Sequence, residues 1–192
     1  GKRYHRCLDC ELVWLDEADH LDDAAEKAVY DGHYNRVDDP RYRGFLMRAF
    51  GEVLSRVSPP ACGLDFGCGP GPALIAMGRE AGFDMAGYDK FYADQPERLT
   101  RRYDFITSTE VIEHLAAPRA VLDGLWACLN PGGVLVLQTQ RVLGDERFKS
   151  WRYRHDPTHI VFFAEASFRA LAARWQADLC FPHADVAVFT KP

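Results

Sequence analysis

Apolar residues recur along this chain with two different periods, and the change falls near residue 61. Between residues 40 and 57 they return every three or four positions, which is the spacing of one helix face. Asp39 suits the cap of that helix and Pro40 its first position. From residue 61 onwards, short apolar runs alternate with amphipathic segments, a texture typical of strand-helix-strand units on a largely parallel sheet.

The predicted elements form an α/β fold. We expect strands over residues 61–66, 84–89, 103–108, 133–139 and 185–190, and helices over 72–81, 118–129 and 165–176. Only "FYADQPERLTRR" separates the second strand from the third, which is too short for an ordinary crossover helix and a further strand. The sheet is therefore predicted to be doubly wound, with helices on both faces and one strand fewer than such a sheet often has.

Composition and charge narrow the function classes. Of the 192 residues, 47% are hydrophobic, which is enough for one substantial core. The net charge of −5 argues against a general binder of nucleic acid. No apolar run reaches the roughly 18 residues of a membrane span. We therefore expect a soluble, cytoplasmic protein that acts on a small molecule without nucleic acid or membrane, and composition leaves the oligomeric state open.

The stretch "LDFGCGPGPAL" contains the clearest chemical signal. Gly67, Gly69 and Gly71 follow a buried strand and open a helix, so that backbone N–H groups face outward with no Cβ in the way of a ligand. Asp65 just ahead of them would repel a pyrophosphate, which favours a cationic or neutral nucleoside. Asp89, at the end of the second strand, lies where a carboxylate accepts hydrogen bonds from ribose hydroxyls.

Two further motifs follow in order, "YDFITSTEVIEHL" and "LNPGGVLVLQT". Together the four motifs resemble those of the class I S-adenosylmethionine-dependent methyltransferases. Within that family the chain most resembles the enzymes that act on small molecules, which include the ubiquinone-pathway O-methyltransferases. The resemblance implies a Rossmann-like, mostly parallel sheet whose last strand is antiparallel. It also implies S-adenosylmethionine as donor and S-adenosylhomocysteine as product. The three glycines would line the methionine portion, Asp65 would meet its amino group, and Asp89 would bind the ribose.

Further cofactor contacts follow from the same resemblance. Thr109 and Glu110 would lie near the methionine or the solvent beside it. Tyr34, with its neighbours in "YDGHYNR", either closes over the cofactor as part of a lid or packs beneath the helix that begins at residue 40. Without a third strand the adenine-side carboxylate has no obvious source, and Asp94 is a weak substitute.

Methyl transfer to oxygen or nitrogen needs a base when the acceptor carries a proton. His114 and His159 are the catalytic candidates. In the alternative interpretation, His114 hydrogen-bonds a loop backbone and His159 is a structural histidine ordered by Asp156. A third interpretation is a site for a hard metal ion, of the kind some ubiquinone-pathway relatives use, with Glu110 and Glu113 beside His114.

The remaining segments leave several interpretations open. Cys7 and Cys10 form half of a zinc-ribbon motif, and zinc would bind only with two further ligands, from His5 and His20 or from a pair upstream. Without such ligands the cysteines are free and the first dozen residues loosely tied. A separate cationic stretch is either a solvated loop or an anion site, and it contains Arg141, Arg147, Lys149, Arg152 and Arg154.

Taken together, the chain is expected to comprise a zinc-ribbon-like remnant (1–16), a helical lid (17–60) and an S-adenosylmethionine-binding domain (61–192). The expected reaction is methyl transfer to a small molecule, with oxygen slightly favoured as acceptor. One alternative is a nicotinamide-dependent oxidoreductase, against which Pro72 and Asp65 argue. The other is a non-catalytic, cofactor-binding regulatory module.

Overall fold

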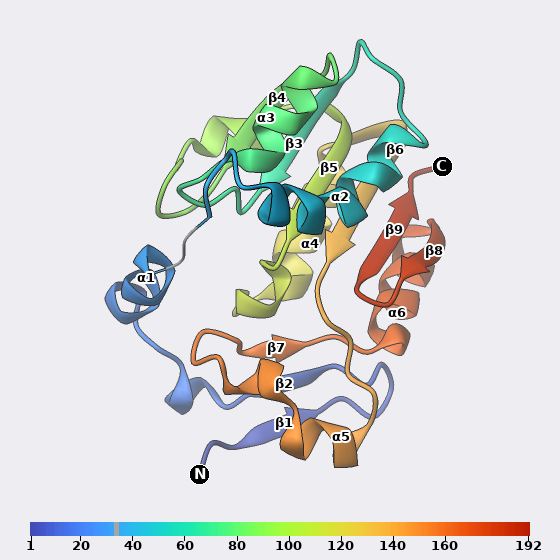
Figure 1. Cartoon of the computed structure of the whole chain (residues 1–192). Helices are drawn as coiled ribbons and strands as arrows, with labels where there is room; N and C mark the ends of the chain where they lie inside the picture. Colours follow the sequence, from blue (N-terminus) through green and yellow to red (C-terminus); the bar gives the residue numbers. More distant parts are fainter. Residues whose placement is uncertain (33–34) are drawn as a thin grey trace.

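The computed structural model describes residues 1–32 and 35–192, which form two β-sheets (Figure 1). The larger sheet has six strands in the order β4-β3-β5-β6-β9-β8. Its strands are β3 (Cys62–Phe66), β4 (Asp84–Tyr88), β5 (Tyr103–Thr109), β6 (Leu129–Gln138), β8 (Asp178–His183) and β9 (Val186–Thr190). The first four in chain order are parallel, and β9 runs antiparallel to both neighbours. The predicted mostly parallel α/β sheet with an antiparallel last strand is confirmed.

Helices cover both faces of this sheet (Figure 1). On one face α2 (Pro40–Leu54) and α3 (Ala73–Glu80) pack into one apolar cluster with the strands. On the other face α4 (Pro118–Ala127) and α6 (Glu165–Trp175) form the second cluster, where the Trp126 and Trp175 rings stack 4.7 Å apart. None of the helices in the described part of the chain is both long and apolar enough to cross a membrane.

The short connection after β4 contains no further strand in the described residues. The chain makes a turn and the 3₁₀ helix η2 (Pro96–Thr100) and then enters β5 directly. As a result β4 lies at one edge of the sheet. Asp94, the substitute for an adenine-side carboxylate, accepts a 3.4 Å hydrogen bond from the Tyr88 hydroxyl. Its predicted role is otherwise untested.

The segment assigned to a lid has two structurally different parts. One side of α2 is buried in the same core as the large sheet, with Ala49 and Val53 fully covered. By contrast, α1 (Asp23–Asp31) contains no buried residue and lies apart from the sheet, after the 3₁₀ helix η1 (Glu17–Asp19) (Figure 1). Only α1 has the sparse packing expected of a lid, and the division of the chain at residues 16 and 60 stays a prediction.

The small sheet attaches the N-terminus to the middle of the chain. Strands β1 (Tyr4–Arg6) and β2 (Val13–Leu15) form a hairpin, and β2 also pairs with β7 (Val161–Phe162). Leu15 is 0% exposed, and the Tyr4 ring packs edge-on against Phe148 at 5.2 Å. Phe148 belongs to α5 (Asp145–Ser150), which precedes the 3₁₀ helix η4 (Arg152–His155). The expectation that the first dozen residues are loosely tied is therefore wrong.

Candidate functional site

A cavity of about 1260 Å³ lies at the carboxyl ends of the parallel strands. Its walls come from four parts of the chain: the turn after β3, the turn after β4, residues 109–116 after β5, and residues 147–160. Residues of α1 and α2 also line it, as do His20, Leu21, Asn35 and Gln140. Open α/β sheets bind their ligands at this edge, where neighbouring connections diverge.

The glycine turn forms the wall next to β3. Gly67 and Gly69 line the cavity, and both have positive φ angles, 79° and 60°, which favour glycine. A Cβ on Gly67 would come within 2.3 Å of the Val111 side chain, whereas one on Gly69 would meet no described atom within 4 Å. The missing side chain of Gly69 therefore leaves open space where a ligand can approach the backbone.

Gly71 differs from Gly67 and Gly69 because it packs against another part of the chain. It does not line the cavity, and a Cβ on it would lie 1.8 Å from the carbonyl oxygen of Asn35. Its lack of a side chain allows the chain that follows α1 to pass directly over the turn. The predicted contact of Gly71 with the methionine portion stays a prediction.

Asp89 connects the tips of β3 and β4. Its Oδ2 accepts a 3.0 Å hydrogen bond from the Gly69 N–H, and its Oδ1 accepts from the N–H groups of Phe91 (2.8 Å) and Tyr92 (3.1 Å). A carboxylate has about four lone-pair sites, so roughly one remains for a ligand. Asp89 therefore supports the glycine turn and still faces the cavity.

Asp65 lies beneath this wall. The side chain is buried, does not line the cavity, and accepts a 2.9 Å hydrogen bond from the Thr107 hydroxyl. Burial, with a smaller contribution from nearby Asp89, raises the pKa of Asp65 to about 7. Its contact with the methionine amino group stays a prediction, and in this geometry such a contact requires a bridging group. Tyr34, another predicted contact, lies outside the described residues.

Thr109 and Glu110 line the cavity, as expected of ligand contacts after β5. Glu110 has a φ of 53°, an uncommon conformation for a residue with a side chain. Burial and the neighbouring Glu113 raise the pKa of Glu110 to about 8, and burial raises that of Glu113 to about 7. The Tyr153 hydroxyl lies within hydrogen-bonding distance of both carboxyl groups. One hydroxyl hydrogen serves only one of them at a time, so this cluster readily holds a proton.

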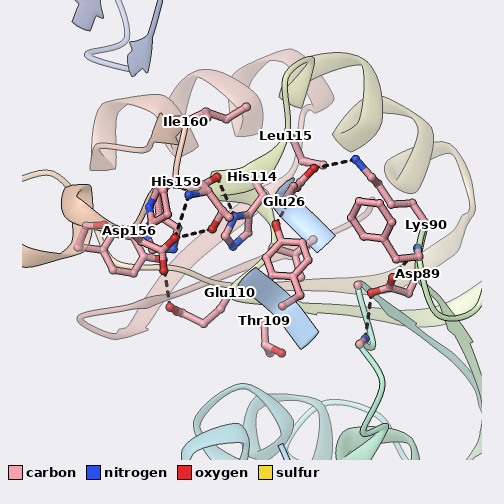
Figure 2. A pocket seen from close by; sticks show the side chains of 18 of the residues that line it. Glu26, Asp89, Lys90, Thr109, Glu110, His114, Leu115, Asp156, His159 and Ile160 are labelled. Atoms are coloured by element: carbon pink, nitrogen blue, oxygen red, sulfur yellow. Dashed lines mark hydrogen bonds and ion pairs between the residues drawn. The ribbon is translucent and has the colours of Figure 1, made fainter. Parts of the chain in front are cut away.

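His114 and His159 lie side by side, with ring centroids 4.8 Å apart, at the opposite end of the cavity from Asp89 and Lys90 (Figure 2). Nδ1 of His114 is 2.9 Å from the Thr158 carbonyl, and Nδ1 of His159 is 2.6 Å from the Tyr153 carbonyl. A carbonyl only accepts, so each Nδ1 carries hydrogen and each neutral ring has its lone pair on Nε2. Both rings combine a backbone anchor with a basic nitrogen, so the structural and catalytic interpretations are compatible.

The same histidines form a possible metal-binding group with Glu113. Ligand atoms of Glu113, His114 and His159 lie within 4.8 Å of one another, and Oε2 of the buried Glu113 has no hydrogen-bond partner among the described residues. This set contains His159 in place of Glu110, which the sequence had suggested as the third ligand. One carboxylate and two imidazoles suit a divalent cation as well as a proton.

The cysteine pair occupies the turn of the N-terminal hairpin. Backbone N–H groups of Cys10 and Asp9 lower the pKa of the Cys7 thiol, whereas burial raises the pKa of Cys10. Both cysteines are free. His5 bonds Asp16 and His20 bonds the Leu15 carbonyl, and the metal-capable group found among the described residues includes neither cysteine. The half zinc site stays a prediction.

Helix α1 covers the cavity through polar contacts that sequence reasoning did not identify. Lys90, next to Asp89, pairs with Asp23 at 3.0 Å and with Glu26 at 2.9 Å (Figure 2). The Tyr30 ring meets His114 edge-on at 5.3 Å. Because α1 buries no residue, these contacts hold it over the cavity. The sequence shows that Lys90 directly follows Asp89. It does not show that Lys90 pairs with Asp23 and Glu26, because these lie more than sixty residues upstream.

Comparison with known proteins gives a consistent result. A family model described as "Methyltransferase domain" matches residues 34–179. The ubiquinone biosynthesis O-methyltransferase of Erwinia tasmaniensis is 26% identical over 100 residues, which cover 52% of this chain and 40% of that protein. The enzyme of the same name from Psychrobacter arcticus is 33% identical over 102 residues, covering 40% of this chain and 39% of that one. The chain thus spans about two fifths of the length of these curated relatives.

Solved structures share the architecture. A Burkholderia thailandensis 1,6-didemethyltoxoflavin-N1-methyltransferase with bound S-adenosylhomocysteine superposes with a TM-score of 0.60 at 17% identity, covering 98% of each chain. A SAM-dependent methyltransferase from Archaeoglobus fulgidus gives a TM-score of 0.59 at 13% identity, over 78% of this chain and 94% of that one. At these identities the likeness is one of fold.

Proposed function

The chain belongs to the methyltransferase domain family, and we propose that it transfers the methyl group of S-adenosylmethionine to a small-molecule acceptor, with oxygen the favoured site. The main support for this proposal is the hydrogen bond between the Gly69 N–H and the Asp89 carboxylate, at the tips of β3 and β4. A glycine without a Cβ opens the wall beside a carboxylate that faces the same cavity.

The charge of this wall suits the proposed donor. Asp89 lines the cavity as a carboxylate that accepts from backbone N–H groups. Glu110 also lines the cavity and Asp65 lies behind it, and their raised pKa values leave both partly protonated near pH 7, so a bound cation favours their ionised forms. A cationic sulfonium nucleoside is attracted to such a wall, whereas the diphosphate of a nicotinamide dinucleotide is repelled. The oxidoreductase alternative is therefore less compatible with these residues. In the proposed arrangement Gly67 and Gly69 hold the methionine portion and Asp89 accepts from the ribose.

S-adenosylmethionine supplies an already activated methyl group when bound. The chain's own task is to hold the acceptor in line with it, to exclude water, and to take up a proton from a hydroxyl acceptor. His159 and His114 present basic Nε2 atoms at the end of the cavity away from Asp89, and His159 is the first candidate for the base because its ring is the more deeply buried. The names of the curated relatives, ubiquinone biosynthesis O-methyltransferases, support oxygen as the methylated atom.

Calorimetry with S-adenosylhomocysteine and with NADH tests the proposal directly. We expect S-adenosylhomocysteine to bind and NADH not to bind, and the reverse result would favour the oxidoreductase. A small-metabolite extract with methyl-labelled donor then tests turnover, and mass spectrometry of the product identifies the methylated atom. Cofactor binding without turnover of any extract would favour the regulatory module.

A chelator separates the two chemical interpretations of the histidine cluster. If His159 acts as a base, labelled methyl transfer persists after dialysis against EDTA. Loss of turnover with EDTA, restored by Mg²⁺ or Zn²⁺, would assign Glu113, His114 and His159 to a metal ion instead.

A further inference from the structure

The segment of residues 145–155 contains four Lys and Arg side chains, two of which line the cavity while the other two have partners within the fold. Lys149 pairs with Glu146 at 2.7 Å. Arg154 donates to the Phe148 carbonyl at 3.3 Å, and its guanidinium lies 5.1 Å from the centre of the Tyr4 ring. Lys149 and Arg154 therefore have their partners within the fold. Arg147 and Arg152 are the two that line the cavity.

Neither of these lining arginines has an anionic partner among the described residues. Within residues 1–32 and 35–192, no ion pair or hydrogen bond engages Arg147 or Arg152, and both side chains are exposed. Lys90 also lines the cavity, but two carboxylates of α1 neutralise its charge. The cavity therefore has an uncompensated positive region, and it lies on the wall that does not contain the glycine turn.

Two acids that line the cavity, one on this wall and one on the wall after β5, are already hydrogen-bonded. Asp156 accepts from the Thr158 N–H at 2.9 Å and also from its hydroxyl, and Glu110 accepts from the Tyr153 hydroxyl at 3.0 Å. These carboxylates have closer partners than the two guanidinium groups. No carboxylate of the described residues forms an ion pair with Arg147 or Arg152, so both guanidinium groups are available to an anion from outside.

Trp151 lies between the two arginines in the sequence and also lines the cavity. Its indole is half-buried and packs 5.1 Å from the Tyr153 ring, which fixes it as an apolar wall. The cavity volume of about 1260 Å³ exceeds the roughly 300–1,000 Å³ typical of a single-ligand pocket, so there is room for an acceptor beside the donor. The site thus offers a flat apolar surface flanked by groups that bind anionic oxygens.

From these contacts we infer that the methyl acceptor is an anionic molecule, with a planar or aromatic body against Trp151 and a phosphate or carboxylate group bound by Arg147 and Arg152. This inference rests on the proposed function, since it assigns the second half of the same cavity. Arg147 and Arg152 are then specificity-determining residues, placed apart from the histidines that face the reacting group.

Three probes with the same ring test the inference on the full chain saturated with S-adenosylhomocysteine. Phenyl phosphate, benzoate and phenol are titrated by calorimetry or by Trp fluorescence. We expect at least one anion to bind at least tenfold more tightly than phenol, since hydrogen bonds to charged groups are the strong ones. Tighter binding of phenyl phosphate identifies a phosphate acceptor, and tighter binding of benzoate identifies a carboxylate.

The variant R147Q/R152Q should weaken the preferred anion at least tenfold and leave phenol unchanged. The single variants R147Q and R152Q should each weaken it in part, and K149Q is the matched control for them, because it also removes one charge from the same segment but at a position that does not line the cavity. The two single variants serve if the double variant fails to fold. Equal anion affinity in R147Q/R152Q and wild type, an equal loss in K149Q, or no preference over phenol would overturn the inference.

The cofactor measurement keeps the two proposals apart. S-adenosylhomocysteine should bind the wild type and all these variants with the same affinity. If it binds but the anions show no preference, the acceptor assignment fails and the proposed function stands. If S-adenosylhomocysteine itself does not bind, the proposed function fails first.

Discussion

Asp89 combines a structural task with a ligand-binding one, and its replacement should affect both by amounts that the structure allows to be estimated. In Asp89→Ala three backbone N–H groups, those of Gly69, Phe91 and Tyr92, lose their acceptor. The side chain is half-buried, so water replaces part of each bond, and about 1 kcal/mol per bond is a reasonable net loss. The variant should therefore be about 3 kcal/mol less stable, which for a chain of this size lowers Tm by roughly 6–12 °C.

Asp89→Asn separates the two tasks. The amide oxygen can still accept from Phe91 and Tyr92, but the NH₂ group then faces the Gly69 N–H, and the charge is gone. Loss of a charged acceptor for a ribose hydroxyl costs about 1.5–3 kcal/mol, so S-adenosylhomocysteine should bind roughly 10–150-fold more weakly. Calorimetry measures this affinity, and thermal melts of the free protein measure the structural part.

Asp84→Asn is the matched control, since Asp84 is exposed at the amino end of β4 and Asp89 follows the carboxyl end of the same strand. It should bind S-adenosylhomocysteine with wild-type affinity. Unchanged affinity in Asp89→Asn would refute the ribose assignment. A wild-type Tm in Asp89→Ala would refute the estimate that the glycine turn depends on this carboxylate.

Three other substitutions test separate parts of the site. Burial raises the pKa of Asp65 to about 7, above the roughly 3.9 of an unfolded aspartate, so the folded state retains a proton that the unfolded state has released. The free energy of unfolding should then fall as pH rises from about 4 to about 7, and urea titrations should show a smaller fall in Asp65→Asn; an equal fall would contradict the assignment. His159→Ala should lower kcat by roughly 10²–10⁴-fold with S-adenosylhomocysteine affinity retained, and unchanged turnover would make the ring purely structural. Lys90→Met removes both ion pairs to α1 and should speed S-adenosylhomocysteine release several-fold in stopped-flow experiments, whereas Lys149→Met, which breaks a pair within α5, should not. Equal release rates in the two variants would argue against a role of the Lys90 ion pairs in holding α1 over the cavity.

Local pattern was sufficient to predict most of the large sheet. The parallel strands and their helices have strong periodicity, and the predicted ranges agree with the structure to within a few residues, apart from the earlier start of β6. Strand β8 was missed because it lies at the sheet edge, is mostly exposed, and includes Pro182. Edge strands of this kind have no buried face to produce an alternating signal.

The site was predictable only where neighbours in sequence are neighbours in space. Asp89 and the glycines could be located because each follows directly from a strand end. The burial of Asp65 against Thr107 and the Tyr153 contact with Glu113 join residues about forty positions apart, and no local pattern records such pairs. The same holds for Gly71, whose close approach to Asn35 depends on where the chain after α1 crosses the turn.

The pairing of β2 with β7 also has a consequence for biosynthesis. Val13 and Leu15 leave the ribosome early, but their strand partner emerges about 150 residues later, and at 5–20 residues per second that delay amounts to roughly 7–30 s. During this interval two apolar side chains that the finished molecule buries remain open to solvent and to other nascent chains. Translation speed and chaperone supply should therefore affect the soluble yield of this protein more strongly than its final stability alone would indicate.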